Sequence, residues 1–421
     1  MTDKYLFPAV IVAAILGWLL ALILGEATWM LDLMRALKTL FLSALKMIMA
    51  PLIFFSLIAG ILKMGSANRL GRTGGLAVGY YLTTTSIAIS IGLICVFFIQ
   101  PWTLFEPLSD TSQFDIDFDR IESLDGSGLA VLSQILKETL VSPFTALANL
   151  NILAIAINAV LIGLALLLVA GDNAAVVNVV DTITNIFYKI TSWVIWVVPL
   201  GVLGIVYELT VSAELELIKQ LVVFSILVVV ATCIHGFVVI PSIAYFVGKA
   251  DLRELFKHGA RPLIVAFTTS SSAATIPVTL TAAQNLKISD STRTFIIPFG
   301  ATANMDGSAL FEGIAAVFIA YLFGVELTAT IVVLIFFASM LASIGAPGIP
   351  SGSMAGMQAV LLMVGLPLEG VLILLIVERP LDMIRTSINV FGDLVGSLVV
   401  DRFSQSEEPM IEPQDSEAVA S

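Results

Sequence analysis

Charged residues are scarce in this sequence: Asp, Glu, Lys and Arg make up only 12% of its 421 residues, whereas 58% are hydrophobic. A soluble domain is excluded, because its water-facing surface would need far more charge. Apolar runs of about 20 residues, the length with which a helix crosses a bilayer, recur along the whole chain. The composition therefore predicts an all-α polytopic membrane protein.

Cysteine and histidine are also rare, with two of each. Cys95 and Cys233 lie in apolar runs without the spacing of metal ligands, so we expect core residues and no disulfide. His235 and His258 form no metal-binding pair. The sequence thus contains neither a disulfide framework nor a metal centre made of His and Cys.

Basic residues are fewer than acidic ones, 20 against 32, which gives a net charge of −12. Seven acids lie between Glu106 and Asp125 and five between Glu407 and Glu417, in a predicted surface loop and a predicted tail. The acidic balance therefore carries no information about a ligand. Ten of the 20 basic residues fall on one side of the predicted spans, opposite the acidic loop, and the positive-inside rule places that side, with both termini, in the cytoplasm. They are Lys4, Arg69, Arg72, Lys249, Arg253, Lys257, Arg261, Lys287, Arg293 and Arg402.

Eight stretches are predicted as transmembrane helices, the first of them long enough to span rather than to serve as a leader. The fourth is too long for one span and should be broken near Pro143 and Asn149 to Asn151. The eight stretches are 6–25, 38–64, 77–100, 130–170, 180–208, 216–247, 291–323 and 371–400.

Two further stretches are interrupted in the middle: 255–286 at the polar run 268–272, and 328–364 at the Gly/Pro-rich run 345–353. Their halves are near a dozen residues, too short to cross, so they predict two re-entrant helical hairpins whose tips meet near the middle of the membrane. One span separates the hairpins, so they enter from opposite sides. Each is followed by a helix with a polar interruption, which makes an inverted repeat of the kind that forms a transporter's binding site.

Five polar residues in the last span recur every three or four positions and so share one helix face: Glu378, Asp382, Arg385, Asn389 and Asp393. A charge at the bilayer centre costs about 2.5–3.5 kcal/mol on insertion scales, so these residues must face a polar cavity or one another. The alternative is a structural seam of salt bridges, with Glu378 and Arg379 only marking the helix entrance before Pro380.

Five motifs are specific when taken together. They are Tyr80-Tyr81-Leu82-Thr83-Thr84-Thr85, Thr269-Ser270-Ser271-Ser272, Asn304-Met305-Asp306-Gly307-Ser308, Ser343-Ile344-Gly345 with Gly348-Ile349-Pro350, and Asp382 through Asp393. On these motifs the chain resembles the glutamate/aspartate transporters of the dicarboxylate/amino acid:cation symporter family, along nearly all its length. The resemblance implies a secondary active symporter that moves aspartate or glutamate into the cell, not an enzyme.

The resemblance also implies a substrate site. Asp382 matches the acceptor of the substrate's ammonium, and Arg385 matches the partner of its side-chain carboxylate, helped by Ser308. A guanidinium fork suits bidentate binding of a carboxylate. The other implied substrate contacts are Ser270, Ser271, Ser272, Ile349, Ser353, Thr386 and Asn389.

Sodium ions are the implied co-transported ions, with protons as a second candidate, and carboxylate and carbonyl oxygens suit such a hard cation. The first implied site comprises Gly300, Asn304, Asn389 and Asp393, the second Thr302, Ser343, Ile344 and Ala346, and the third Tyr81, Thr84, Thr85, Asn304 and Asp306. For Tyr81 and its threonines, hydrogen bonding between helices is the alternative, and for Met305 it is packing.

Glu312 follows Asn304 by eight residues, about two helical turns, and so lies near the same face. Proton-coupled members of the family carry glutamate here and sodium-only archaeal members glutamine, which implies that Glu312 carries a proton with the substrate. The alternative is that Glu312 is a structural acid paired with a residue of a neighbouring helix, for example Arg379.

Four positions depart from the family pattern. Archaeal members carry arginine at the position of Ser270 and animal members at that of Met383, which leaves transport rate and counter-ion coupling open. Ser308 stands where threonine is usual in the family, which keeps the hydroxyl. Ala346 lacks the side-chain hydroxyl that is usual at its position.

The resemblance implies a homotrimer in the inner or plasma membrane, with the lipid bilayer as surroundings and no nucleic-acid partner. A scaffold of the first, second, fourth and fifth helices would hold a transport core that moves as an elevator. The predicted units are 1–76 (mainly scaffold), 77–129 (third helix and acidic loop), 130–215 (scaffold and trimerisation), 216–403 (transport core) and 404–421 (acidic tail).

Three other functions remain open from the residues alone. The same fold can move a C4-dicarboxylate or cystine. Asp382 argues against a dicarboxylate without an amino group, because the two carboxylates of that substrate would face an unpaired acid. An intramembrane protease would use Asp306 and Asp393 as an aspartyl pair or Ser351 as a nucleophile. A pure channel fits two opposed hairpins less well than alternating access does.

Overall fold

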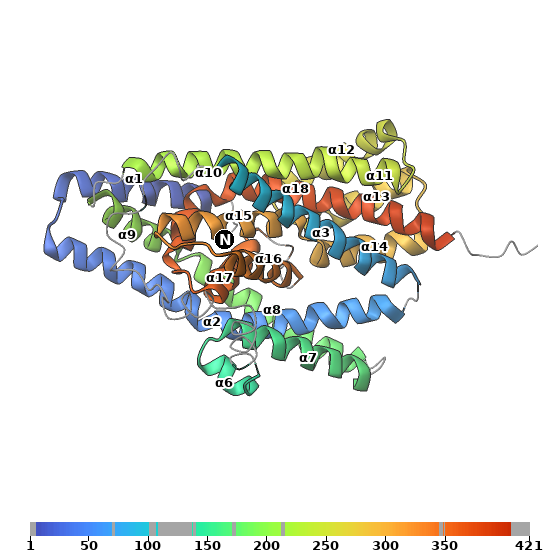
Figure 1. The fold of residues 1–421 in the computed structure, drawn as a ribbon, viewed down its shortest axis with the longest axis horizontal. Coiled ribbons are helices and arrows are strands. Elements are labelled where there is room, and N and C mark those ends of the chain that lie inside the picture. Colours follow the sequence, from blue (N-terminus) through green and yellow to red (C-terminus); the bar gives the residue numbers. More distant parts are fainter. Residues whose placement is uncertain are drawn as a thin grey trace, which may run out of the picture.

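The computed structural model describes residues 6–69, 72–100, 107, 137, 140–170, 174–211, 215–344, 348 and 350–405. Every regular element in this part of the chain is a helix (Figure 1), which confirms the all-α prediction. Nearly all of the acidic 106–125 loop and most of the 404–421 tail lie outside the described residues.

The α-helices, with one short π-helix (η3), follow one another in this order: α1 Leu6–Leu24, α2 Thr28–Arg69, α3 Arg72–Ile99, α6 Pro143–Ala148, α7 Ile152–Ala170, α8 Ala174–Ile195, α9 Val198–Val211, α10 Leu215–Ile234, η3 His235–Val239, α11 Ile240–Phe246, α12 Leu252–Thr269, α13 Ser272–Asn285, α14 Asp290–Ala303, α15 Asp306–Leu322, α16 Ala329–Ile344, α17 Ser353–Val364 and α18 Glu369–Gln405.

Five helical stretches of the described chain are long and apolar enough to cross a membrane, judged by length and composition: Thr28–Leu62, Arg72–Ile99, Ile152–Val169, Lys219–Phe246 and Asp290–Leu322. Four shorter apolar helices accompany them: Pro8–Leu24, Val198–Val211, Ala329–Ile344 and Ser353–Val364. The chain is thus a multi-pass membrane protein, and the count of eight spans remains a prediction.

Several boundaries differ from those predicted. The second helix is longer than 38–64, because α2 runs from Thr28 to Arg69. The 180–208 stretch is two helices, α8 and α9, separated at Trp196 and Val197. The 216–247 stretch contains the π-helix η3, which begins at His235. Apolar composition continues across these points, so it could not reveal them.

The predicted break in the fourth stretch is confirmed, because α6 ends at Ala148 and α7 begins at Ile152. The break at 300–308 is confirmed too: Asn304 and Met305 are non-helical and separate α14 from α15. The polar residues of the last span do not break its helix, which confirms the helical spacing predicted for the stripe. Helix α18 continues without a break from Glu369 to Gln405, through Pro380 and the whole polar stripe.

The tip of the first predicted hairpin has a local cause. Ser270 adopts the left-handed conformation, with φ 51°, which ends α12. Ser271 is extended, and its side chain accepts a hydrogen bond from the backbone N–H of Ala274, so it caps α13. The helices α12 and α13 pack on each other, as do α16 and α17. The 16 residues of α16 and 12 of α17 extend only about 24 and 18 Å, less than a bilayer core.

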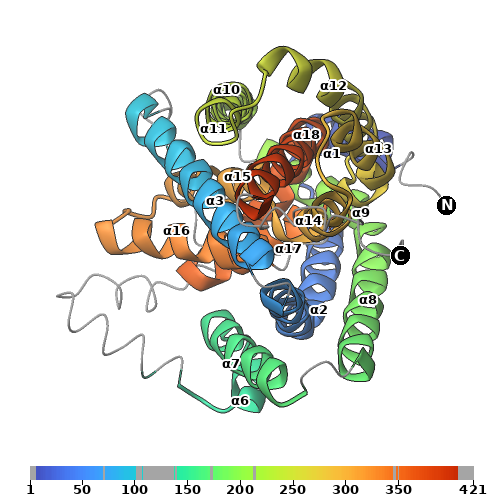
Figure 2. The same ribbon diagram turned by 90° about the vertical axis from the view of Figure 1, so that its right-hand side faces the viewer.

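The helices form two groups, one packed around the long helix α2 and the other around the long helix α18. Helix α2 packs against α7, α8 and α9, and α9 against α1. Helix α18 packs against α12, α13, α14, α15 and α3. Figure 2 shows α2, α6, α7 and α8 on one side, and α18 with α13, α14 and α15 on the other. The candidate functional residues belong mainly to the α18 group.

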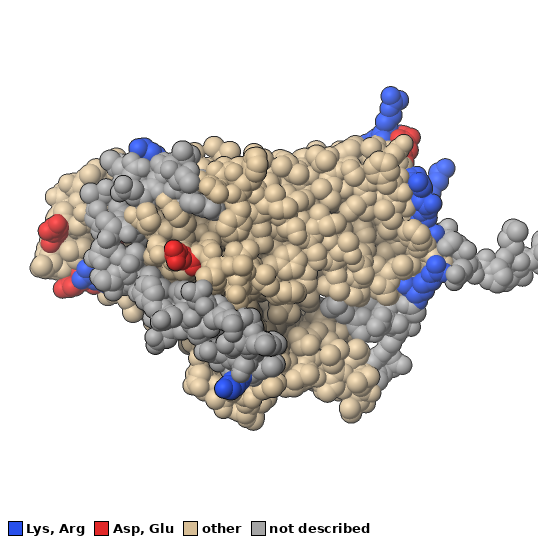
Figure 3. All heavy atoms as spheres, in the orientation of Figure 1, with Lys and Arg blue, Asp and Glu red and all other residues tan. Residues whose placement is uncertain are grey.

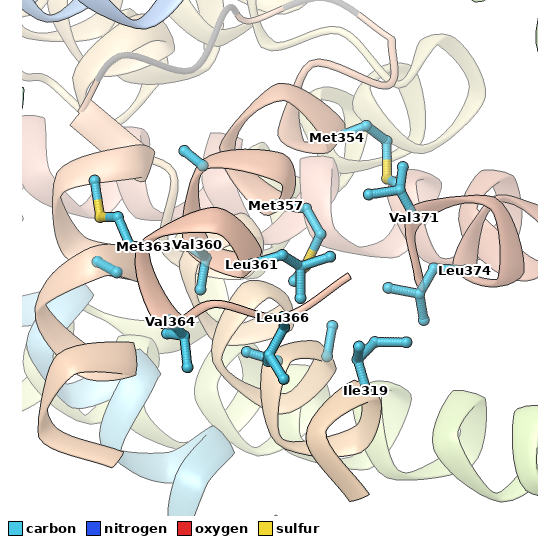
Figure 4. Close-up of a cluster of buried hydrophobic side chains, with 14 of the residues drawn as sticks. Ile319, Met354, Met357, Val360, Leu361, Met363, Val364, Leu366, Val371 and Leu374 are labelled. Atoms are coloured by element: carbon cyan, nitrogen blue, oxygen red, sulfur yellow. The ribbon is translucent and has the colours of Figure 1, made fainter. Parts of the chain in front are cut away.

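Helix α17 is surrounded by apolar side chains (Figure 4). Met357 and Leu361 of α17 are fully buried, close to Ile319 of α15 and Leu374 of α18. Methionine side chains are unbranched and fill irregular gaps, so this interface can repack. Cys95 and Cys233, expected in the core, are only half-buried.

Lys and Arg side chains gather at one end of the visible face in Figure 3, on the right. The end of α18 lies there in Figure 1, near α11 and α12. This grouping matches the one-sided distribution of basic residues in the sequence.

Candidate functional site

The polar stripe of α18 is buried along its whole length. Its five predicted members are each at most 4% exposed, and Thr386 beside them is 6% exposed. The rest of α18 is only partly covered, because Leu381 and Phe391 are buried whereas Pro380 is exposed. The prediction that the stripe faces the interior is therefore confirmed.

Arg385 lies at the centre of the stripe and is fully buried. Its Nη2 donates to Glu378 Oε1 at 2.9 Å and, more weakly, to Asp382 Oδ1 at 3.5 Å. The guanidinium carbon lies 3.8 Å from the ring centroid of Phe311, a cation–π contact from α15. Among the described residues, neither Nε nor Nη1 has a hydrogen-bond partner.

The alternative of a salt-bridge seam is thus partly right, but it lies within α18 rather than between helices. Glu378 does more than mark the helix entrance, since it binds Arg385 and accepts a hydrogen bond from Ser351 Oγ at 3.0 Å. The seam is incomplete, because a buried guanidinium has five N–H donors and only Nη2 is engaged. The unused donors mark where an anionic group could bind.

The stretch between α16 and α17 connects this stripe to the α12–α13 tip. Ser271 Oγ donates to the carbonyl of Gly348 at 2.8 Å. Ser351 donates its backbone N–H to Asp382 Oδ2 at 3.0 Å. The α12–α13 junction, the residues before α17 and α18 are therefore in contact. Ile349 lies outside the described residues.

Several hydroxyls near this junction are buried. Ser270 and Ser353 are 1% and 4% exposed, and their hydroxyl oxygens have no hydrogen-bond partner in the described chain. Ser272 and Ser308 are buried as well, and Ser308 follows Gly307, where a side chain would overlap the backbone of Arg385. The predicted substrate residues that can be described are therefore in one region.

Three helices begin at this region: α13 at Ser272, α15 at Asp306 and α17 at Ser353. The N-terminus of α15 is capped from outside, because the Gly307 N–H donates to Asn389 Oδ1 at 2.8 Å. Helix N-termini carry partial positive charge and free N–H groups, so they favour anions. Together with Arg385, they make the region suited to carboxylates.

The residues of the first implied sodium site are in contact. Asn304 Nδ2 donates to Asp393 Oδ1 at 2.9 Å and to the Asn389 carbonyl at 3.1 Å. A side chain at Gly300 would overlap Asp393 Oδ1 and the Tyr81 hydroxyl. Asn304 Oδ1 is buried without a partner among the residues described. Asn304, at the end of α14, and the Tyr81 hydroxyl of α3 thus lie near Asp393 of α18.

The third implied site has Asp306 at its centre. Thr85 and Thr84 donate their hydroxyls to Asp306 Oδ1 at 2.6 and 3.3 Å. Tyr81, expected here, instead donates its hydroxyl to the Ile296 carbonyl at 3.2 Å and lies beside Gly300. Hydrogen bonding between helices, the alternative for these three residues, therefore occurs in the structure.

His235 is a residue that sequence reasoning missed. Its Nε2 lies 3.1 Å from Asp306 Oδ2, and both side chains are fully buried. The signal was a histidine inside an apolar span, which is costly unless it has a polar partner. It lies at the start of the π-helix, and such turns often occur at functional sites.

The residues of the second implied site are less complete. Ser343 and Ile344 line a small cavity together with Tyr81 and Thr85. Thr302 is the residue before Ala303, which lines the same cavity, and its hydroxyl donates to the Phe299 carbonyl at 3.1 Å. Ala346 lies outside the described residues. Met305, for which packing was the alternative, is buried and its sulfur accepts a hydrogen bond from Asn389 Nδ2 at 3.3 Å.

Glu312 is fully buried on α15, and neither carboxyl oxygen has a hydrogen-bond partner in the described part of the chain. The alternative pairing with Arg379 is wrong, because Arg379 lies 3.8 Å from Asp382 instead. Glu312 Oε1 lies against Gly356 of α17, where any side chain would overlap it. A buried carboxyl without a partner is stable only when it is neutral or meets a transient partner.

Comparison with known proteins covers nearly the whole chain. The family described as the sodium:dicarboxylate symporter family matches residues 6–403. Excitatory amino acid transporter 2 of Rattus norvegicus is 31% identical, with 96% of this chain and 79% of the rat protein covered. An excitatory amino acid transporter of Caenorhabditis elegans is 29% identical over 87% of this chain and 81% of its own length. Excitatory amino acid transporter 3 of Oryctolagus cuniculus is 27% identical, with 97% and 87% covered.

Proposed function

Because this chain belongs to the sodium:dicarboxylate symporter family, whose members are transporters and not enzymes, we propose that it carries aspartate or glutamate into the cell with sodium. The names of its relatives as excitatory amino acid transporters support this substrate class. The protease alternative falls with the family. Asp306 is also already bound by two threonines and His235.

One observation carries the proposal: Arg385 is fully buried, yet its Nε and Nη1 have no partner among the described residues. A buried guanidinium without enough acceptors costs several kcal/mol, so a ligand carboxylate would stabilise the site. In the proposed complex the substrate's side-chain carboxylate binds Arg385, with Ser308, and its ammonium binds Asp382. Thr386, Asn389, Ser353 and the α12–α13 tip hold the rest of the molecule.

Sodium is the co-transported ion in this proposal. Asp393 with Asn304 and Asn389, and Asp306 with Thr84 and Thr85, provide hard oxygen ligands. The hydroxyls that donate to Asp306 would turn their lone pairs to the ion. His235 would keep the second oxygen of Asp306 in place. The supporting observation is that these oxygens come from different helices and converge on two buried carboxylates.

Glu312 is the proposed proton carrier. It lies beside Gly356, so its contact with solvent depends on the position of α17. The Glu312 carboxyl has no partner while α17 lies against it, which favours its neutral form, and it can lose the proton when α17 moves away. Movement of α17 would thereby connect proton release to the transport cycle.

The proposed architecture has eight spans and two opposed re-entrant hairpins, α12–α13 and α16–α17. The α1, α2 and α6–α9 group would form the scaffold of a homotrimer in the plasma or inner membrane, and the α18 group would move as an elevator. The packing of α7, α8 and α9 on α2, and of α12 to α15 on α18, supports this division, and the two groups contact each other where α9 meets α18 and α2 meets α3. The basic residues at one end support cytoplasmic termini.

The test is uptake of labelled aspartate, glutamate and succinate by proteoliposomes under sodium and proton gradients imposed separately. We expect aspartate or glutamate to accumulate when sodium is higher outside. Accumulation that needs no sodium would contradict sodium coupling. Succinate taken up in preference to both amino acids would instead establish the dicarboxylate alternative.

A further inference from the structure

Four buried residues form a closed ring between α18 and the residues that precede α17. Glu378 and Asp382 each contact both Arg385 and Ser351, at distances of 2.9 to 3.5 Å. None of the four is more than 9% exposed. The ring holds two carboxylates around a single guanidinium.

The way in which Arg385 is occupied restricts how a ligand can bind. A guanidinium grips a carboxylate with two parallel N–H groups along either of two edges, one formed by Nε and Nη2 and the other by Nη1 and Nη2. Both edges include Nη2, and Nη2 holds both Glu378 and Asp382. A ligand carboxylate can therefore bind bidentately only after one of these two acids withdraws.

The two acids are not equally able to withdraw. Glu378 has the shorter bond to Arg385, 2.9 against 3.5 Å, whereas Ser351 holds the other oxygen of each acid at the same distance, 3.0 Å. Asp382 also has a second cation nearby, Arg379 at 3.8 Å. Asp382 is therefore the acid that gives way.

We propose that Glu378 is a selectivity residue, which makes the site favour acidic amino acids over dicarboxylates that lack an amino group. This inference rests on the proposed function. Glu378 permanently holds one edge of Arg385. The ammonium of an amino-acid substrate attracts Asp382 away from Arg385, so that the other edge of the guanidinium can bind the substrate's carboxylate. A dicarboxylate has no ammonium, so Asp382 stays on Arg385, and Asp382 and Glu378 both repel the ligand's carboxylates.

The test compares aspartate and succinate binding by calorimetry at fixed pH and saturating sodium, in the unmodified protein and in Glu378→Gln. The amide has the size of the acid and can still bond to Ser351, but it lacks the charge that holds Arg385. We expect the preference for aspartate over succinate to fall at least about tenfold, chiefly because succinate binds more tightly.

Two further variants control for structure. Glu326→Gln removes an exposed acid outside the site and should leave the preference unchanged. Glu378→Asp is one methylene shorter and cannot reach both Arg385 and Ser351 as well, so its preference should lie between those of the unmodified protein and Glu378→Gln. It also provides the measurement if the Gln variant fails to fold, and a preference equal to the unmodified one would then overturn the proposal.

The outcomes separate this inference from the proposed function. A Glu378→Gln variant with unchanged thermal unfolding and an unchanged aspartate preference overturns the inference, because the folded protein then discriminates without the Glu378 charge. An unmodified protein that binds succinate as tightly as aspartate also overturns the inference, but leaves it an acidic-substrate transporter. An unmodified protein that binds neither ligand overturns both.

Discussion

The buried charges between α2 and α9 differ from those along α18 in one respect: they are complete. Glu208 of α9 accepts from Arg35 Nε at 3.0 Å, and its other oxygen lies 2.6 Å from Lys38 Nζ. Along α18, by contrast, Arg385 keeps donors without partners, and Glu312 nearby has none for either oxygen among the residues described.

The difference has a physical meaning. Buried polar groups that bond to one another have no unsatisfied hydrogen bonds when no ligand is bound, so the Glu208 group is expected to be static. Groups that remain unsatisfied raise the free energy of the empty site, and a ligand that completes them binds tightly. The comparison therefore favours α18, and not the charged cavity of about 350 Å³ beside Glu208, as the proposed substrate region.

The largest effect is expected from removing the cation of the incomplete group. Arg385→Thr or Arg385→Cys should cost acidic substrates about 2–5 kcal/mol, more than tenfold in affinity, and should favour small neutral ones. Calorimetry with aspartate in sodium measures the loss. The control is Arg379→Gln, which removes a nearby arginine whose side chain is 22% exposed and should change affinity much less. Unchanged aspartate binding in the Arg385 variants would refute the assignment.

A smaller effect is expected at Asp393. Asp393→Asn keeps a hydrogen-bonding group beside Asn304 but removes the charge, so half-saturation should need several times more sodium while the fold persists. Aspartate binding measured against sodium concentration gives this shift. Asp290→Asn, at an acid whose side chain is 78% exposed, serves as the control. If the Asp393 variant titrates with sodium as the unmodified protein does, Asp393 is not a sodium ligand.

Glu312→Gln should leave affinity nearly unchanged and alter coupling instead. The amide cannot carry a proton, so dependence of uptake on a pH gradient should disappear, while exchange of labelled for unlabelled substrate persists. A pH-sensitive dye inside the vesicles measures proton entry, with Glu326→Gln as the exposed control. Equal acidification in the unmodified and Gln proteins would make Glu312 structural.

The smallest effect on transport is expected in the complete group. Glu208→Gln leaves Lys38 buried without its carboxylate, so the melting temperature in detergent should fall. The cost should stay below the roughly 3–5 kcal/mol of a fully buried pair, because the side chain of Arg35 is 54% exposed. Aspartate affinity should not change. A large loss of affinity with no change in melting temperature would contradict the distinction between the two groups.

Much of the proposed substrate region could be predicted from local patterns. The spacing of the α18 stripe, the serine-rich α12–α13 tip and the break at Asn304 are features of neighbouring residues, and the structure confirms all three. The polar residues of the last span do not break its helix, unlike those at 300–308, because polar residues end a buried helix only when its backbone lacks other support. In α18 the polar side chains find partners without any change of backbone.

What the sequence determined by itself was the membrane-embedded helical class, the polar face of α18 and the family, since periodicity and short motifs depend on residues close in the chain. Only the tertiary structure decided that His235 meets Asp306, 71 positions away, and that Ser351 holds Glu378. It also decided that Glu312 faces Gly356 rather than Arg379. These pairings depend on how separate helices pack, and the free energy of packing is set by shape and burial summed over many residues, which no local pattern records.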